Sequence, residues 1–275
     1  MKLSFTTLGC PNWALEQIAQ NAKALGYDGI ELRTNSDGNH FSSEASTDDA
    51  QRVGKLFRDH GVPVMSVMGY CKFAFSDEAD TTKNQALMRR LLPLAEAMGA
   101  KYVRTFAGAI PKEIDPKVAV EKVSDALRPL AAEAASRGVT IGLETHDAWC
   151  SGKQVMELVD RVKSPKGFGI VYDIFNAYTT GLEPWNVTYQ TVKDHICYCH
   201  VKDGYKNKDG KYVYVMVGAG DLPMSEIIQT IVKDGYKGFF SFEWEKKWHA
   251  ELEEPERAFP QYPPKMRLWD KAAKA

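Results

Sequence analysis

The sequence predicts an α/β fold, a single-domain TIM barrel that spans residues 1–275. The first observation is that short apolar runs of strand length alternate with longer amphipathic segments along the chain. Strict alternation implies parallel strands, because a parallel connection needs a helix to cross back over the sheet. The second observation is that about eight such units occur, and eight βα units close into a barrel. The third is the length of 275 residues, since one such barrel typically uses about 250.

The expected strands are short, largely apolar runs, and most of them follow a glycine. A glycine just past a helix C-terminus adopts positive φ without a Cβ clash, so Gly138 is interpreted as the end of a helix. The run that follows it is short and apolar enough to be a strand buried on both faces. By the same criteria we expect strands at residues 3–7, 30–33, 62–67, 102–104, 139–144, 167–173, 197–203 and 238–245.

The segments between these runs have apolar residues spaced three and four apart, which is typical of a helix with one buried face. In residues 13–25, for example, Leu15, Ile18 and Ala22 share a face. Asp115 is a good capping residue, and Pro116 follows it in the first helical turn. Helices are therefore expected at residues 13–25, 48–60, 81–98, 117–137, 152–162, 184–194 and 222–233.

The last part of the chain departs from this pattern. Residues 248–275 are polar and contain four prolines, so we expect an irregular C-terminal tail with a short final helix from Lys265. A doubly wound open sheet is the alternative fold. That fold would need a glycine-rich phosphate loop, and neither GxGxxG nor GxxxxGKS/T occurs in the chain.

Composition argues against several partners. Lys plus Arg number 35 and Asp plus Glu number 36, a formal net charge of -1, so nothing favours a nucleic acid or an acidic membrane. No apolar run approaches the roughly 20 residues of a membrane helix, and the N-terminus has no signal-peptide core, so a cytoplasmic protein is expected. The five cysteines lack CxxC spacing, which favours reduced thiols. Strand alternation predicts that Cys197 and Cys199 point outward toward the helices.

Four of the expected strands carry side chains that suit a metal ion near their C-terminal ends. These are Glu144, Asp173, His200 and Glu243. The carboxyl ends of barrel strands meet at one mouth, so we expect the four side chains to lie together. Three carboxylates and one imidazole, without thiolate, suit a hard or borderline divalent cation. Mn²⁺ is the expected ion, with Mg²⁺, Co²⁺ and Zn²⁺ as alternatives.

These motifs give the chain a family resemblance. It resembles the xylose isomerase-like TIM barrels, the group described as sugar phosphate isomerases and epimerases, through GYDGIELR, GLETHD, YDIFN, CHVKDG and FSFEWE. The resemblance covers most of the chain. It implies that Glu144, Asp173, His200 and Glu243 bind the metal, and that Glu144 and Glu243 also carry the proton as catalytic residues.

The function implied by the resemblance is that of a sugar, sugar phosphate or keto-polyol isomerase or epimerase. A carboxylate would remove a proton next to a carbonyl, leaving an enediolate that the cation stabilises. Returning the proton to the same carbon from the other face gives epimerisation, and returning it to the neighbouring carbon gives isomerisation. Two alternatives stay open. One is a metal-dependent lyase, inosose dehydratase-like or eliminating from a 3-keto-glycoside, and the other is a carbohydrate-binding subunit with little activity of its own. A homo-oligomer is compatible with the resemblance.

Two further family positions can be recognised, and one departs from the pattern. Glu31 looks like the acid of the second strand, and His200, Lys202 and Asp203 look like the HxKD signature. Several relatives have a histidine three residues after the ligand aspartate, whereas this chain has Asn176. Asparagine can bind a hydroxyl group but cannot donate a proton as histidine does. This departure counts against a ketose 3-epimerase and an endonuclease IV-like site.

Several polar side chains near the strand ends are candidates for contact with a sugar substrate. Each also has a purely structural interpretation; Arg104, for example, could bind a hydroxyl or phosphate group or could pair with a nearby acid. The loop 70–80 is rich in aromatic and polar residues and is a candidate lid. The candidate substrate-binding residues are Glu31, Arg33, Arg104, His146, Asn176 and Lys202.

Overall fold

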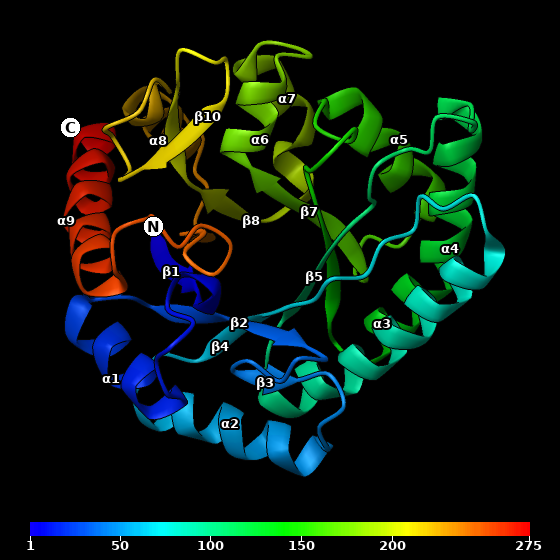
Figure 1. Cartoon of the computed structure of the whole chain (residues 1–275), viewed down its shortest axis with the longest axis horizontal. Helices are drawn as coiled ribbons and strands as arrows, with labels where there is room; N and C mark the ends of the chain where they lie inside the picture. Colours follow the sequence, from blue (N-terminus) through cyan, green and yellow to red (C-terminus); the bar gives the residue numbers. More distant parts are fainter.

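Eight parallel strands close on one another in the computed structural model, which describes residues 1–275 (Figure 1). Each strand pairs with the next along the ring, and β1 pairs with both β11 and β2, so no edge is left open. All eight expected strands are present, and the TIM barrel is confirmed. The barrel strands are β1 (Lys2–Thr6), β2 (Gly29–Asn35), β4 (Val64–Met68), β5 (Tyr102–Phe106), β6 (Thr140–Glu144), β7 (Phe168–Asp173), β8 (Ile196–Val201) and β11 (Phe239–Phe242).

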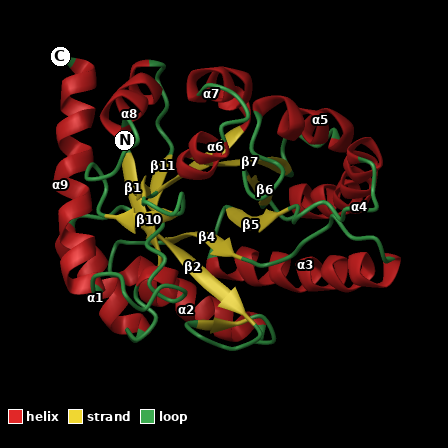
Figure 2. Ribbon diagram, turned by 45° about the horizontal axis from the view of Figure 1, so that its top comes forward, coloured by secondary structure: helices red, strands yellow, loops and turns green.

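Helices surround the strands on the outside of the barrel (Figures 1 and 2). Ser46 and Ser151 each form a capping box at a helix start, and Asp115 caps the helix that begins at Pro116. The seven expected helices are confirmed, with ends that differ by at most a few residues. They are α1 (Leu15–Leu25), α2 (Thr47–Asp59), α3 (Glu78–Met98), α4 (Pro116–Ser136), α5 (Gly152–Val162), α7 (Trp185–Val192) and α8 (Met224–Lys233). No helix combines the length and apolarity that crossing a membrane would require.

The expectation of an irregular tail is wrong, because residues Pro255–Lys274 form one helix, α9. Pro255 occupies the first turn, where a missing N–H does no harm. Three more prolines lie within the helix. Their unfavourable effect is offset by burial, since Phe259 and Tyr262 are fully buried against the barrel. The ring of Phe259 lies against that of Phe5, with ring centroids 4.2 Å apart. Local propensity therefore gives way to tertiary packing in this segment.

Alternation along the strands separates the main core from the barrel interior. Leu3 and Phe5 of β1 face the helices and belong to the large apolar core. Cys199 is also in that core, as expected, but Cys197 is not. Between β7 and β8 the register shifts, so that Val171 pairs with Tyr198 and Cys197 is skipped. Cys197 therefore packs against the small cluster inside the barrel instead of pointing outward.

Besides two single-turn 3₁₀ helices, η1 (Thr7–Gly9) and η2 (Lys193–His195), four short elements were not expected. The strands β9 (Asp203–Lys206) and β10 (Tyr212–Val215) form an antiparallel hairpin directly after β8. This hairpin packs on α6 (Ile174–Thr180), where the Phe175 ring lies 5.3 Å from Tyr212 and 5.4 Å from Tyr214. The short strand β3 (Phe41–Ser42) extends the sheet beside β2. All four follow the C-terminal ends of barrel strands, the side on which the candidate site lies.

Candidate metal centre and active site

The four predicted metal ligands meet at the mouth of the barrel. Glu144 and Asp173 end β6 and β7, His200 lies near the end of β8, and Glu243 directly follows β11. All four side chains are buried. Each offers one ligand atom, and these atoms lie within 4.8 Å of one another. The structure thus brings together, from four strands, the set that the sequence singled out.

The geometry of this group fits a divalent cation. Nδ1 of His200 lies 2.9 Å from Oε1 of Glu144, 3.4 Å from Oε1 of Glu243 and 3.9 Å from Oδ2 of Asp173. Oδ2 of Asp173 is buried and has no hydrogen-bond donor, although the ammonium of Lys202 forms an ion pair with it. Three buried carboxylates this close repel one another, and a doubly charged ion that takes one oxygen from each would relieve the repulsion.

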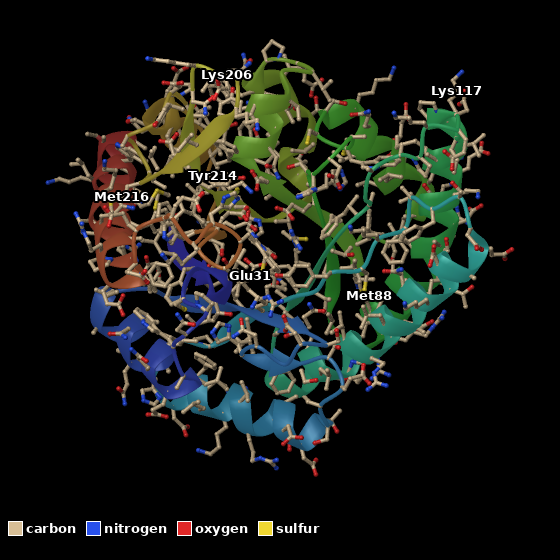
Figure 3. All side chains as sticks on the ribbon, viewed as in Figure 1. Glu31, Met88, Lys117, Lys206, Tyr214 and Met216 are labelled. Atoms are coloured by element: carbon tan, nitrogen blue, oxygen red, sulfur yellow. The ribbon has the colours of Figure 1, made fainter.

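Glu31 holds the other side of the His200 ring. Its carboxylate accepts from Nε2 of His200 at 2.8 Å, from the Tyr198 hydroxyl at 2.6 Å and from the Ser241 hydroxyl at 2.9 Å. Burial would lower the pKa of His200, but Glu243, Glu31 and Glu144 raise it well above its usual value, so without a bound ion both ring nitrogens donate to carboxylates. A bound cation would replace the proton on Nδ1, while Nε2 continues to donate to Glu31. Figure 3 shows Glu31 in the interior of the barrel, away from the outer surface. These contacts make Glu31 a residue that orients His200.

Arg104 pairs with Glu144 deep in the site. Nε of Arg104 donates to Oε2 of Glu144 at 2.6 Å, and its Nη1 donates to the carbonyl of Gly69 at 3.0 Å. Burial by itself raises the pKa of Glu144, but Arg104 and His200 together outweigh burial and lower this pKa to about 2. Glu144 is therefore a carboxylate at neutral pH. The arginine thus pairs with an acid and also faces the cavity. Its binding of a substrate hydroxyl or phosphate group stays a prediction.

Lys202 forms ion pairs with three acids on the opposite side of the group. Its Nζ lies 2.6 Å from Oε2 of Glu243, 2.9 Å from Oδ2 of Asp173 and 3.2 Å from Oε1 of Glu245. Burial raises the pKa of Asp173 to about 7, and the neighbouring ammonium only partly offsets this effect. Burial would raise the pKa of Glu243 as well, but His200 and Lys202 hold it well below its usual value. Both glutamates thus have a cationic partner that keeps them ionised.

A cavity of about 210 Å³ opens at this group. Three of the predicted substrate-binding residues line it, namely Arg104, His146 and Lys202. The His146 ring stacks on the ring of Phe106 at 4.9 Å. The cavity is lined by Leu8, Met68, Tyr70, Arg104, Phe106, His146, Lys202, Glu243, Glu245 and Trp248. The apolar members were harder to find, although Phe106 follows Arg104 by two residues and so shares its face of β5.

The other predicted substrate-binding residues lie outside the lining of the cavity. Arg33 is buried and forms two hydrogen bonds with the carboxylate of Asp37, at 2.8 and 2.7 Å. The amide nitrogen of Asn176 donates to the carbonyl of Thr145 at 3.1 Å. Of the candidate lid 70–80, only Tyr70 reaches the cavity. Direct substrate contact by Glu31, Arg33 and Asn176 stays a prediction.

Comparison with known families places the chain in a class that fits this geometry. Residues 19–263 match the family described as xylose isomerase-like TIM barrel. The match covers most of the chain, so the protein belongs to this family, and the resemblance recognised in the sequence is confirmed.

Individual relatives are distant in sequence but similar over the whole chain. Fructoselysine 3-epimerase of Escherichia coli O157:H7 is 23% identical over 253 residues, which are 88% of this chain and 90% of the relative. The structure of an L-ribulose 3-epimerase has a TM-score of 0.82 at 17% identity, covering 100% of this chain and 96% of the other. The structure of the IolI protein with a bound zinc atom has a TM-score of 0.74 at 20% identity, with the same coverage. These structures show a shared fold.

Proposed function

We propose that this protein is a divalent-metal-dependent sugar isomerase or epimerase that removes a proton from a carbon next to a carbonyl group. The observation that carries the proposal is the buried group of Glu144, Asp173, His200 and Glu243, whose ligand atoms lie within 4.8 Å of one another at the edge of a cavity. The names of two relatives, fructoselysine 3-epimerase and L-ribulose 3-epimerase, support sugar epimerisation as the class of reaction.

The four ligands would hold Mn²⁺, and the bound zinc atom in the structure of the IolI protein, which shares this fold, supports a divalent ion. When bound, such an ion draws electron density from the carbonyl and hydroxyl oxygens of a sugar and so acidifies the C–H between them. The protein would supply the orientation. Glu31 fixes the His200 ring, while Arg104 and Lys202 fix one oxygen each of Glu144 and Glu243.

The two glutamates are the proposed proton carriers. One carboxylate accepts the proton from the substrate carbon, and the electron pair of the C–H bond moves toward the carbonyl oxygen. Inversion requires that the second glutamate first takes up a proton from solvent; it then returns this proton to the carbon from the opposite face and is a carboxylate again. Return to the neighbouring carbon moves the carbonyl group instead. The amide of Asn176 donates a hydrogen bond to the carbonyl of Thr145 and cannot act as an acid. Proton transfer is therefore assigned to Glu144 and Glu243 alone.

The test is NMR in D₂O with the Mn²⁺-loaded protein and a panel of ketoses. Deuterium exchange at a carbon next to the carbonyl, with the sugar skeleton retained, is the expected result. Loss of water or of an aglycone would show a lyase instead. Sugar binding without exchange in the presence of any of the four metals would show a binding subunit.

Variants then assign the exchange to the two carboxylates. Glu144→Gln and Glu243→Gln should each slow exchange by roughly 10²- to 10⁴-fold, the usual contribution of a positioned base. Glu157→Gln is the matched control, because Glu157 is exposed on α5. Metal content is measured for each variant, so that loss of the ion is distinguished from loss of the base. Unchanged exchange in both site variants would overturn the assignment.

A further inference from the structure

The cavity above the proposed metal centre has charged and apolar parts. The charged part consists of Arg104, His146, Lys202, Glu243 and Glu245. The apolar part consists of Leu8, Met68, Tyr70, Phe106 and Trp248. A metal-chelating keto-sugar accounts for the charged part, because its oxygens need ligands and hydrogen-bond partners. The apolar part needs a separate explanation.

Trp248 is the most unusual residue of the apolar part, because it lines the cavity and yet 53% of its surface is exposed. It lies in the loop between β11 and α9, only five positions after Glu243. Its backbone N–H donates to the carbonyl of Glu245 at 3.0 Å, and the N–H of Lys247 donates to the carbonyl of Leu8 at 3.2 Å. The loop that carries this ring is therefore tied to the loop after β1.

The Trp248 ring also has a fixed neighbour. The guanidinium carbon of Arg33 lies 5.6 Å from the centre of the Trp248 ring and 5.2 Å from that of Tyr70. Asp37 holds the same guanidinium by two hydrogen bonds, and the Arg33 side chain is inaccessible to solvent. Arg33 thus anchors both aromatic rings at the rim of the cavity. A large aromatic side chain that is held in place and left half in water beside a cavity is typical of a ligand contact.

We infer that Trp248 is a stacking platform for a second ring of the substrate, so that the protein acts on a keto-sugar that carries a ring-bearing substituent. This inference rests on the proposed function, because it assumes that the keto-sugar itself lies at the charged part of the cavity. The outer ring would stack on the exposed surface of Trp248. A single sugar ring bound at the charged part of the cavity would leave this surface exposed. A second sugar ring and an aromatic group both present a flat apolar face, so either source fits this surface.

The test compares dissociation constants for D-fructose with those for ketoses that carry a second ring. Turanose, maltulose and palatinose supply a second sugar ring at three positions, and 1-O-benzyl-D-fructose supplies an aromatic ring. Binding to the Mn²⁺-loaded protein is measured by isothermal titration calorimetry. At least one two-ring ketose should bind about 3- to 10-fold more tightly than D-fructose, as an aromatic stacking contact provides. Tighter binding of a disaccharide ketose would indicate a second sugar ring, and tighter binding of 1-O-benzyl-D-fructose would indicate an aromatic group.

Variants tie this selectivity to the ring. The quantity compared is the dissociation constant of D-fructose divided by that of the tightest two-ring ketose. In Trp248→Ala this ratio should fall to about one, and in Trp248→Tyr it should stay close to the wild-type value. Tyr205→Ala is the matched control, because Tyr205 is an aromatic residue that is 41% exposed and does not line the cavity; its ratio should equal that of the wild type. A wild-type ratio of one for all four two-ring ligands, or an unchanged ratio in Trp248→Ala, would overturn the inference. The D₂O exchange assay is independent of this ratio, so failure of the proposed reaction is distinguishable from failure of the platform.

Discussion

Among single residues, Glu31 best illustrates how a buried charge acts through a neighbour. It is separated from His200 by 169 positions in the chain and lies 2.8 Å from it in space. Burying a carboxylate is unfavourable unless donors satisfy it, and here Tyr198, Ser241 and His200 all donate to it. These three donors fix the carboxylate, and the carboxylate in turn fixes the imidazole. Glu31 thus positions His200, and the substrate contact that the sequence suggested for it stays a prediction.

We expect Glu31→Gln to weaken Mn²⁺ binding by about 10- to 100-fold, the usual effect of changing a residue that orients a metal-binding histidine. The amide oxygen can still accept from Nε2 of His200 and from the Ser241 hydroxyl, but the NH₂ group then faces the hydroxyl donor of Tyr198. Calorimetric titration with Mn²⁺ measures the effect, with Glu157→Gln as the control. Equal metal affinity in Glu31→Gln and the wild type would contradict the orienting role.

A second residue-scale prediction concerns acid stability and His40, away from the metal centre. Burial lowers the pKa of His40 to about 4. In the unfolded chain the pKa of His40 has its ordinary value of about 6.5. Between about pH 4 and pH 6.5, His40 is therefore protonated in the unfolded chain and neutral in the folded protein. This stability is therefore fully present above about pH 6.5 and is lost as the pH falls toward 4. His40 has a φ of 67°, a conformation that asparagine tolerates. Urea unfolding at about pH 7 and about pH 5 should show a smaller loss in His40→Asn than in the wild type. Equal losses would show that His40 titrates normally in the folded protein.

At the scale of elements, α9 shows packing overriding local signals. The helix contains three internal prolines and lies along one side of the barrel beside α1 and α8 (Figure 2). Its inner face places Phe259 among the rings of Phe5, Trp13 and Phe242. The segment stays helical because leaving the barrel would expose these aromatic surfaces to water.

Phe259→Ala should therefore lower the free energy of unfolding by roughly 3–5 kcal/mol, the usual result of removing a buried phenyl ring. Leu268→Ala on the same helix should change it by no more than about 0.5 kcal/mol, because Leu268 is 64% exposed. Urea unfolding followed by circular dichroism measures both. Similar small effects of the two substitutions would mean that α9 contributes little to the stability of the barrel.

At the scale of the whole molecule, barrel closure would connect the proposed metal binding to stability. The four ligands come from β6, β7, β8 and the end of β11, so the complete site exists only when the barrel is folded. An ion that binds the folded state alone stabilises it by about 2.7 kcal/mol at a hundred times its dissociation constant. In a domain of this size that corresponds to a rise in Tm of about 5–10 °C.

Adding MnCl₂ to the EDTA-treated protein should produce this rise, as measured by differential scanning calorimetry, and renewed EDTA should reverse it. The double variant Glu144→Gln Glu243→Gln should unfold at a temperature that no longer depends on Mn²⁺. If none of Mn²⁺, Mg²⁺, Co²⁺ and Zn²⁺ raises the Tm of the wild type, the proposed metal centre is refuted.

The sequence by itself determined the barrel and the membership of the four-residue group. Strand alternation and the spacing of helices are local properties, and closure of eight βα units follows from their number. Because all strand ends meet at one mouth, Glu144, Asp173, His200 and Glu243 could be grouped without knowledge of distances. The main errors, α9 and Cys197, lie where a local rule is overruled, by aromatic packing in one case and by a bulge in the other.

Only the tertiary structure decided which side chains contact one another. The pairing of Arg104 with Glu144, the contact of Glu31 with His200 and the contacts of Arg33 with Tyr70 and Trp248 depend on the stagger of strands and on loops that reach across the mouth. Hydrogen bonds and ring contacts change within about an ångström, whereas a sequence pattern specifies only the face on which a residue lies. For that reason the four-residue group could be predicted as a set, while the partner of each side chain around it could not.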